Sequence, residues 1–191
     1  MAPQPSYTKL THSATYPAIN PSLPGLSNDG KVILITGATG GIGRATASSF
    51  AASGPRALIL LGRRPDGLAE TAKLVRSSHG TLTVQTHKVD LCDGAGVRRA
   101  FDQVVAEFSG IDIVVHCAGA LAPVVPILDA DPNTFLDGYK TTVVGTLTVA
   151  QSAVLANRSA ITNEGAKDRE IIFINLTTAG ILFTPFHGMG A

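Results

Sequence analysis

The stretch Val32-Ile-Leu-Ile-Thr-Gly-Ala-Thr-Gly-Gly-Ile-Gly43 decides the fold, because a run of apolar residues leads directly into a glycine-rich turn. The run Val32–Ile35 is continuous and mostly β-branched, which is typical of a strand that is covered on both faces. Residues 42–53 then have the pattern of a helix. The sequence therefore predicts a strand, a tight glycine turn and a helix in immediate succession.

The same alternation continues along the chain. Helices are expected at 42–53, 67–78, 95–108 and 132–156, and further strands at 57–61, 82–89, 111–115 and 171–174. Gly54-Pro55 ends the first helix, and Asp131-Pro132 begins the last with Asp as the capping residue. The pattern predicts an α/β fold with a doubly wound parallel sheet of order 3-2-1-4-5.

Two segments have no such pattern. Residues 1–29 are rich in Pro, Ser and Thr, and we expect an extended arm there. The arm either lies across a neighbouring surface or is a mobile tail. The polar stretch 157–169 is expected to be a surface loop.

Composition narrows the possible partners. A chain of 191 residues is long enough for one domain, and its net charge of +1 gives no basic patch for nucleic acid or for an acidic membrane surface. No secretory leader and no apolar run of about 18 residues are found, so a soluble cytoplasmic protein is expected. The two cysteines, Cys92 and Cys117, lack the spacing of a metal site, and no metal is expected.

The glycine turn is the sharpest functional signal. Glycines at this position let the backbone pass close to a pyrophosphate, and the amino end of the following helix offers free N–H groups to its charge. A purely structural turn is the alternative interpretation. The strand before, the helix after and a second strand about 25 residues further on favour a dinucleotide site.

The second strand indicates which dinucleotide is bound. It ends in Leu61-Gly-Arg-Arg64, without the acidic side chain that usually holds the ribose hydroxyls of NAD. A guanidinium at Arg63 can instead pair with the 2′-phosphate of NADP. NADP is therefore favoured, and the alternative is two solvated arginines in a loop.

The third and fourth strands also end in residues that suit a nucleotide. The carboxylate of Asp90, followed by Leu91, can accept a hydrogen bond from the adenine amino group. The fourth strand ends in His116-Cys-Ala-Gly-Ala120, whose small residues suit the close passage of a ribose. A metal at His116 and Cys117 is disfavoured because no further ligands occur at a sensible spacing.

These motifs, in this order and at these intervals, resemble the short-chain dehydrogenase/reductase family from Lys31 to the end of the chain. The resemblance implies that residues 30–191 form a Rossmann-type NADP-binding domain, incomplete at its carboxyl-terminal side. It also implies hydride transfer between NADP(H) and a small carbonyl or alcohol substrate. The implied cofactor-binding residues are Gly37, Thr39, Gly41, Ile42, Gly43, Arg63, Asp90, Leu91, Cys117, Ala118 and Gly119.

The catalytic residues depart from the family pattern. Thr142 stands where the family has a helix Asn that anchors a water chain, and Thr178 best matches the catalytic Ser. The family's Tyr-x-x-x-Lys would begin at about Ala191, where the sequence stops. The resemblance therefore implies a chain truncated before this motif, nearly inert by itself, with a homo-oligomer interface that is only half built.

Three hypotheses follow. The first is an oxidoreductase whose remaining residues lie beyond this sequence. The second is a non-catalytic NADP-binding or regulatory protein. The third is a nonfunctional remnant. Binding of NADPH distinguishes the second from the third.

Overall fold

Five parallel strands form the centre of the molecule. The computed structural model describes residues 12, 14–79, 81–120, 123, 125–161 and 170–176. Its sheet has the order β3-β2-β1-β4-β5, which confirms the predicted fold. The strands are β1 (Val32–Thr36), β2 (Ala57–Gly62), β3 (Thr83–Lys88), β4 (Ile113–His116) and β5 (Ile172–Asn175).

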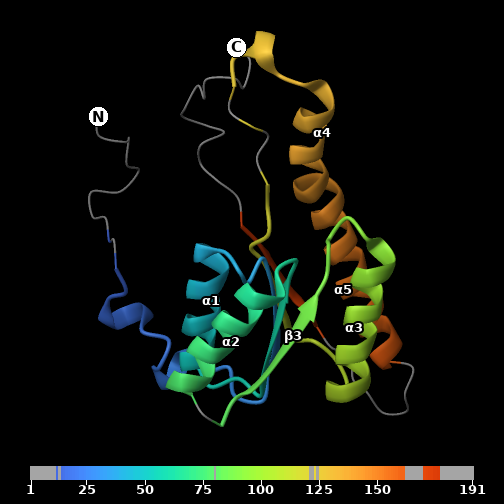
Figure 1. Ribbon diagram of the computed structural model, residues 1–191. Helices are drawn as coiled ribbons and strands as arrows, with labels where there is room; N and C mark the ends of the chain where they lie inside the picture. Colours follow the sequence, from blue (N-terminus) through green and yellow to red (C-terminus); the bar gives the residue numbers. More distant parts are fainter. Residues whose placement is uncertain are drawn as a thin grey trace.

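Helices cover both faces of this sheet (Figure 1). Helices α1 and α2 pack on one face, and α3 and α5 pack on the other. A π-helical turn of five residues, called here the π segment, joins α4 to α5. The bounds are α1 (Gly41–Ala52), α2 (Pro65–Ser78), α3 (Gly94–Phe108), α4 (Pro132–Lys140), the π segment (Thr141–Gly145) and α5 (Thr146–Ile161).

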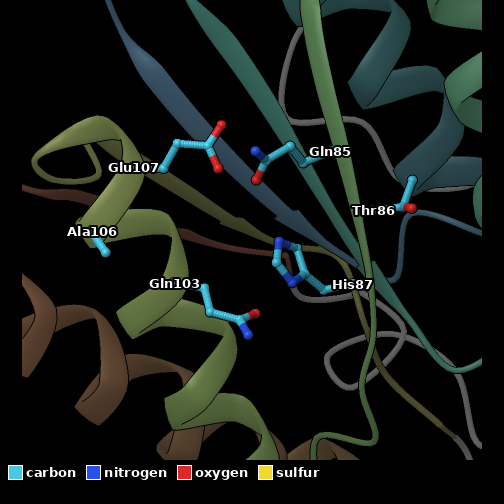
Figure 2. A pocket seen from close by; sticks show the side chains of 6 residues that line it. All are labelled: Gln85, Thr86, His87, Gln103, Ala106 and Glu107. Carbon is cyan, nitrogen blue, oxygen red and sulfur yellow. The ribbon is translucent and has the colours of Figure 1, made fainter.

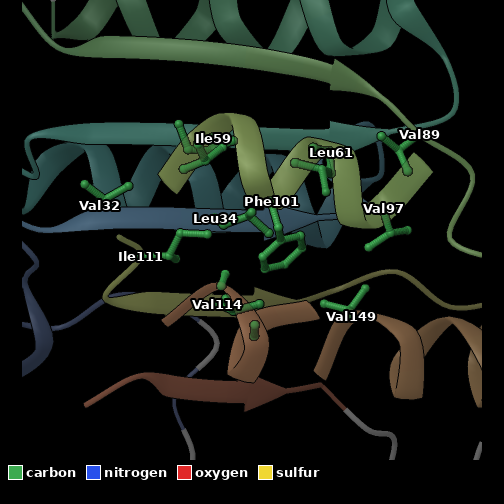
Figure 3. Close-up of a cluster of buried hydrophobic side chains, with 14 of the residues drawn as sticks. Val32, Leu34, Ile59, Leu61, Val89, Val97, Phe101, Ile111, Val114 and Val149 are labelled. Carbon is green, nitrogen blue, oxygen red and sulfur yellow. The ribbon is translucent and has the colours of Figure 1, made fainter. Parts of the chain in front are cut away.

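The apolar runs of the sequence account for this two-sided packing. Successive side chains of a strand point to opposite faces, so a strand that is buried on both faces must be apolar throughout. In β1, Val32 and Leu34 pack with Phe101 of α3, while Ile33 and Ile35 pack with the helices of the other face. Figure 3 shows Phe101 on the face that α3 and α5 cover, among Leu34 of β1 and Val114 of β4.

The predicted helix boundaries hold where the sequence carries a capping signal. Gly54 follows α1 with a φ of 71°, in the left-handed region that favours glycine. Asp131 caps α4, because its Oδ1 accepts from the backbone N–H of Thr134 at 2.7 Å. The capping predictions are therefore confirmed.

One boundary is corrected. The helix expected at 132–156 is interrupted by the π segment and continues to Ile161, so the first residues of the expected loop 157–169 are helical. Ala156 and Asn157 are almost fully buried, and tertiary packing of these two residues outweighs the polar composition that indicated a loop from Asn157 onward. Residues 162–169 lie outside the described part of the chain.

The N-terminal segment is joined to the domain at its end. Its described residues include two short 3₁₀ turns, η1 (Pro17–Ile19) and η2 (Pro24–Leu26), and a third, η3 (Ile127–Asp129), precedes α4. The backbone N–H of Asn28 donates to the carbonyl of Ser53 at 2.8 Å, and its Nδ2 donates to the Ser53 hydroxyl at 2.8 Å. An arm over residues 1–29 stays a prediction.

No helix in the part of the chain that the structure describes is both long and apolar enough to cross a membrane.

Candidate functional site

The glycine turn lies at the junction of β1 and α1, as predicted. Gly37 has a φ of 65°, and a Cβ at this residue would stand 2.7 Å from the backbone nitrogen of Ala118. A Cβ at Gly43 would overlap the carbonyl oxygen of Gly37. Both positions therefore require glycine, because the turn, the helix and the segment that follows β4 approach one another at backbone distance.

A cleft of about 570 Å³ opens beside this turn, at the carboxyl ends of β1 to β4. In open parallel sheets ligands bind at this edge, where the strand order reverses. Of the predicted cofactor residues, the cleft is lined by Gly37, Thr39, Arg63, Asp90, Leu91, Cys117, Ala118 and Gly119. Gly41, Ile42 and Gly43 form the adjoining first turn of α1.

Thr39 determines how the end of β2 approaches the turn. A Cβ at Gly62 or at Gly67 would each stand 3.0 Å from the Thr39 side chain, so that side chain fills the space between the two glycines. Nη2 of Arg64 donates to the carbonyl of Thr39 at 3.2 Å. Arg63 and Arg64 are both exposed and both line the cleft, which gives this end a positive charge.

At the end of β3, Asp90 and Leu91 lie in two different environments. Asp90 is exposed, and its Oδ1 accepts from the backbone N–H of Cys92 at 3.0 Å. Leu91 is buried, and a Cβ at Gly145 would stand 3.0 Å from its own Cβ. Leu91 thereby packs the cleft wall against the π segment, while Asp90 faces solvent at the cleft.

The segment after β4 forms the opposite wall. The N–H of Ala118 donates to the hydroxyl of Thr36 at 3.3 Å, and the thiol of Cys117 lies 3.8 Å from the hydroxyl of Thr46. Burial raises the pKa of the Cys117 thiol, against a smaller opposing effect of the bond to Thr46. Cys117 is therefore a protonated, weakly nucleophilic thiol near neutral pH.

The two predicted catalytic residues differ in what the structure describes. Thr142 lies in the π segment, and its hydroxyl donates to the carbonyl of Ala120 at 2.9 Å and accepts from the Ala120 N–H at 3.2 Å. Its neighbour Thr141, and not Thr142, lines the cleft. Thr178 lies outside the described residues.

The sequence interpretation missed the role of His116. The side chain is 2 % exposed, and its Nδ1 and Nε2 lie 2.9 Å from the Thr36 hydroxyl and 3.1 Å from the Thr146 hydroxyl. Burial lowers its pKa, which favours the neutral ring. A buried histidine directly before the small residues of the cleft wall was the available signal, but it was weighed only as a metal ligand. Within the described ranges, no three His, Cys, Asp or Glu residues are grouped so that they could hold a metal.

A second hollow, of about 640 Å³, lies between β3 and α3. Figure 2 shows the side chains that line it, among them Gln85 and His87 from the strand and Gln103 and Glu107 from the helix. Burial lowers the pKa of His87, and the negative charge of Glu107 partly opposes this shift. No glycine turn and none of the predicted site residues lie here, so the cleft at the strand ends is the better candidate site.

Comparison with known proteins agrees with this geometry. Residues 31–175 match the family described as short chain dehydrogenases, which is more than half of the chain. The chain belongs to this family.

Three similar proteins illustrate its range. A short chain dehydrogenase of Monascus purpureus is 32 % identical over 144 residues, covering 74 % of this chain and 49 % of its own. An NADP-dependent 3-hydroxy acid dehydrogenase of Schizosaccharomyces pombe is 30 % identical over 142 residues, covering 72 % of this chain and 54 % of its own. The structure of an NAD⁺-bound xylitol dehydrogenase superposes with a TM-score of 0.71 at 28 % identity, covering 84 % of this chain and 58 % of its own. The chain thus spans about half the length of the curated relatives that it matches.

Proposed function

We propose that this chain carries the NADP(H) site of an oxidoreductase that transfers hydride between the cofactor and a small carbonyl or alcohol substrate. The observation that carries the proposal is the backbone contact among Gly37, Gly43 and Ala118, which leaves no room for a Cβ beside the amino end of α1. A helix amino end approached by bare backbone is suited to a diphosphate.

The described residues fit each part of such a cofactor. The N–H groups of the first turn of α1, at Gly41, Ile42 and Gly43, would hold the diphosphate. Asp90 and Leu91 would contact the adenine, and the backbone of Ala118 and Gly119 would lie along a ribose. When bound, NADPH supplies the hydride. The protein contributes binding and orientation.

Arg63 supports NADP over NAD. It lines the cleft at the end of β2, and Gly62 leaves that strand end without a carboxylate that would repel the 2′-phosphate. The bond from Arg64 to the Thr39 carbonyl holds a second guanidinium close to the same position. Two positive charges beside a 2′-phosphate would give charge-assisted hydrogen bonds that NAD could not form.

Titration of the purified chain with NADPH and with NADH, followed by cofactor fluorescence, tests this proposal. We expect Arg63→Ala to weaken NADPH binding about tenfold, because a hydrogen bond to a charged group is lost, and to leave NADH binding within about twofold. Absence of saturable NADPH binding by the parent chain would refute the cofactor proposal. An equal loss for both cofactors would refute the assignment of Arg63 to the 2′-phosphate.

A second candidate function is NADP binding without catalysis. It is favoured by Thr142, whose hydroxyl makes two bonds to Ala120 and is therefore poorly placed to anchor a water chain. Thr178 stays a prediction as the hydroxyl that would bond a substrate carbonyl. A chain that binds NADPH tightly but consumes none with any of a series of aliphatic and aromatic ketones and aldehydes would support this second function.

A cytoplasmic location likewise stays a prediction.

A further inference from the structure

A chain of hydrogen bonds leaves the segment Cys117–Ala120 at Ala118 and returns to it at Ala120, so that the backbone between these residues closes a ring; Cys117, Ala118 and Gly119 of this segment line the cleft. The ring begins at Ala118, whose N–H donates to the hydroxyl of Thr36 in β1. It continues through both nitrogens of His116 to the hydroxyl of Thr146, which donates to the carbonyl of Thr142. The Thr142 hydroxyl closes the ring through two bonds to the backbone of Ala120.

The partners fix the direction of each bond. A backbone carbonyl can only accept, so the single proton of the Thr146 hydroxyl is committed to Thr142. The Thr146 oxygen must therefore accept from Nε2 of His116, which carries a proton. In the neutral ring Nδ1 is then bare, and it accepts the proton of the Thr36 hydroxyl. The ring is consistent with one tautomer of neutral His116.

We propose that His116 is a positioning residue of the cofactor cleft, which holds the wall Cys117–Ala120 in register with the π segment through Thr36 on one side and Thr146 on the other. The inference rests on the proposed function, since it concerns the same cleft. His116 itself does not line the cleft and acts through the backbone that does.

The shape of the site explains why a histidine suits this role. The two hydroxyls that it joins belong to β1 and to the first residue of α5, so one side chain must offer a polar atom at each of two edges. The imidazole of His116 is almost fully buried and stacks on the side chain of Phe173 in β5, with centroids 6.3 Å apart and an angle of 21° between the planes. This packing holds the orientation of the ring, and with it the positions of both nitrogens.

Thr142 also takes part in the ring of hydrogen bonds, through two of its own groups. Its hydroxyl and its carbonyl are both used within the ring, one at Ala120 and one at Thr146. Thr142 therefore holds the Ala120 end of the cleft wall, while His116 holds the end at Cys117 and Ala118. A π-helical turn at this position is in keeping with the frequent occurrence of such turns at functional sites.

Three variants separate the two sides of the imidazole. His116→Asn places polar atoms near the position of Nδ1 and can reach Thr36 alone, and His116→Gln reaches toward Nε2 and Thr146 alone. His116→Phe keeps the size of the ring and the stacking on Phe173 but has no polar atom. We expect His116→Phe to weaken NADPH binding about tenfold, because the buried hydroxyl of Thr36 and the half-buried hydroxyl of Thr146 each lose a partner and the wall shifts. The Asn and Gln variants are expected to give intermediate losses.

Binding of adenosine 2′-monophosphate distinguishes positioning of the wall from general destabilisation. Arg63 and Asp90 lie at the ends of β2 and β3, outside the ring, so we expect the affinity of this fragment for His116→Phe to stay within about twofold of the parent. Unchanged NADPH binding, or an equal loss for both ligands together with a lower melting temperature, would overturn the proposal. If His116→Phe does not fold, Thr146→Val at the half-buried end of the ring is measured in the same way.

The tautomer offers an independent test that needs no cofactor. The ¹⁵N shifts of the imidazole, assigned by their loss in a histidine variant, are expected to show a neutral His116 protonated at Nε2 and bare at Nδ1. The opposite tautomer or a cationic ring would overturn the ring of hydrogen bonds. If the parent chain shows this tautomer but does not bind NADPH, the proposed function fails while the ring itself stands, so the two failures can be told apart.

Discussion

Gly43 lies where α1 begins against the glycine turn, and its hydrogen atom faces the carbonyl of Gly37. A Cβ here would overlap that oxygen and stand 2.8 Å from the Gly37 carbonyl carbon. We expect Gly43→Ala to lower the free energy of unfolding by about 3 kcal/mol, because backbone atoms cannot yield as a flexible side chain can. Urea unfolding followed by circular dichroism measures this loss.

Gly41 provides the matched control, two residues earlier in the same helix. Nothing lies within 4 Å of a Cβ built on it. Alanine is favoured over glycine in helices by about 1 kcal/mol, so Gly41→Ala is expected to leave stability unchanged or slightly raised. If Gly43→Ala proved as stable as Gly41→Ala, the close approach at the turn would be wrong.

At the scale of single elements, Asp112 ties the beginning of β1 to the beginning of β4. Its buried carboxylate accepts from the backbone N–H of Val32 at 2.7 Å, and its own N–H donates to the Val32 carbonyl at 2.9 Å. We expect Asp112→Leu to lower the free energy of unfolding by about 2 kcal/mol, because a buried N–H loses its acceptor. Thermal and urea unfolding measure the change.

Asp112→Asn is the conservative counterpart. Its amide oxygen can still accept from Val32, so the loss is expected to be less than half that of the Leu variant. Equal losses for the two substitutions would mean that the negative charge beside Lys31, at 3.8 Å, matters more than the hydrogen bond to Val32.

The elements that the sequence predicts well are those with local signals. The strand-turn-helix at 32–43 is encoded by adjacent residues, and Asp131 and Gly54 mark helix ends by their own conformational preferences. The end of α5 could not be predicted in this way, because burial of Ala156 and Asn157 depends on residues far along the chain. The π segment had no local signal that distinguished it from an ordinary helix.

The same distinction applies to the site. Most residues that line the cleft could be predicted because they lie at or just after the end of a strand, whereas Thr141 belongs to the π segment. His116 could not be assigned a partner, since Thr36 and Thr146 lie 80 and 30 residues away from it. Thr142 was interpreted through the resemblance as a relay residue, whereas its bonds to Ala120 depend on how the π segment meets the loop after β4.

At the scale of the whole molecule, two half-buried or buried histidines make stability depend on pH. Burial lowers the pKa values of His87 and His116 from their ordinary value of 6.5. Below that pH the unfolded chain binds protons that the folded chain does not, so stability is full above 6.5 and falls as the pH drops toward the folded values. We expect the melting temperature to decrease from about pH 7.5 to about pH 5.5.

Histidine variants show which residues cause the decrease in melting temperature at low pH. His87→Gln keeps a polar side chain at the hollow beside α3 but cannot titrate, so its decrease is expected to be smaller than that of the parent. His12→Gln, at an exposed position of the N-terminal segment, is the control and should follow the parent curve. A His87→Gln curve that coincides with the parent would remove His87 as a source of the pH dependence.

The outer side of α4, the π segment and α5 carries an exposed apolar row at intervals of seven, four and seven residues. The row consists of Leu136, Val143, Leu147 and Val154. Exposed apolar patches of this kind mark association surfaces, and we expect the chain to self-associate through it. Leu147→Glu should weaken self-association about tenfold in sedimentation velocity over a series of concentrations.

Leu74 gives the comparison. It is an exposed leucine of α2, on the opposite face of the sheet, so Leu74→Glu adds the same charge away from the row. Equal sedimentation of both variants and the parent at every concentration would exclude the row as an interface.

The residues that line the cleft lie in one continuous block of the sequence. All of its lining residues among the described part of the chain fall between Gly37 and Thr141. A nucleotide preference encoded in one uninterrupted block can be exchanged between related genes by a single pair of crossovers. Swapping residues 31–145 between two family members is therefore expected to move cofactor choice as a cassette.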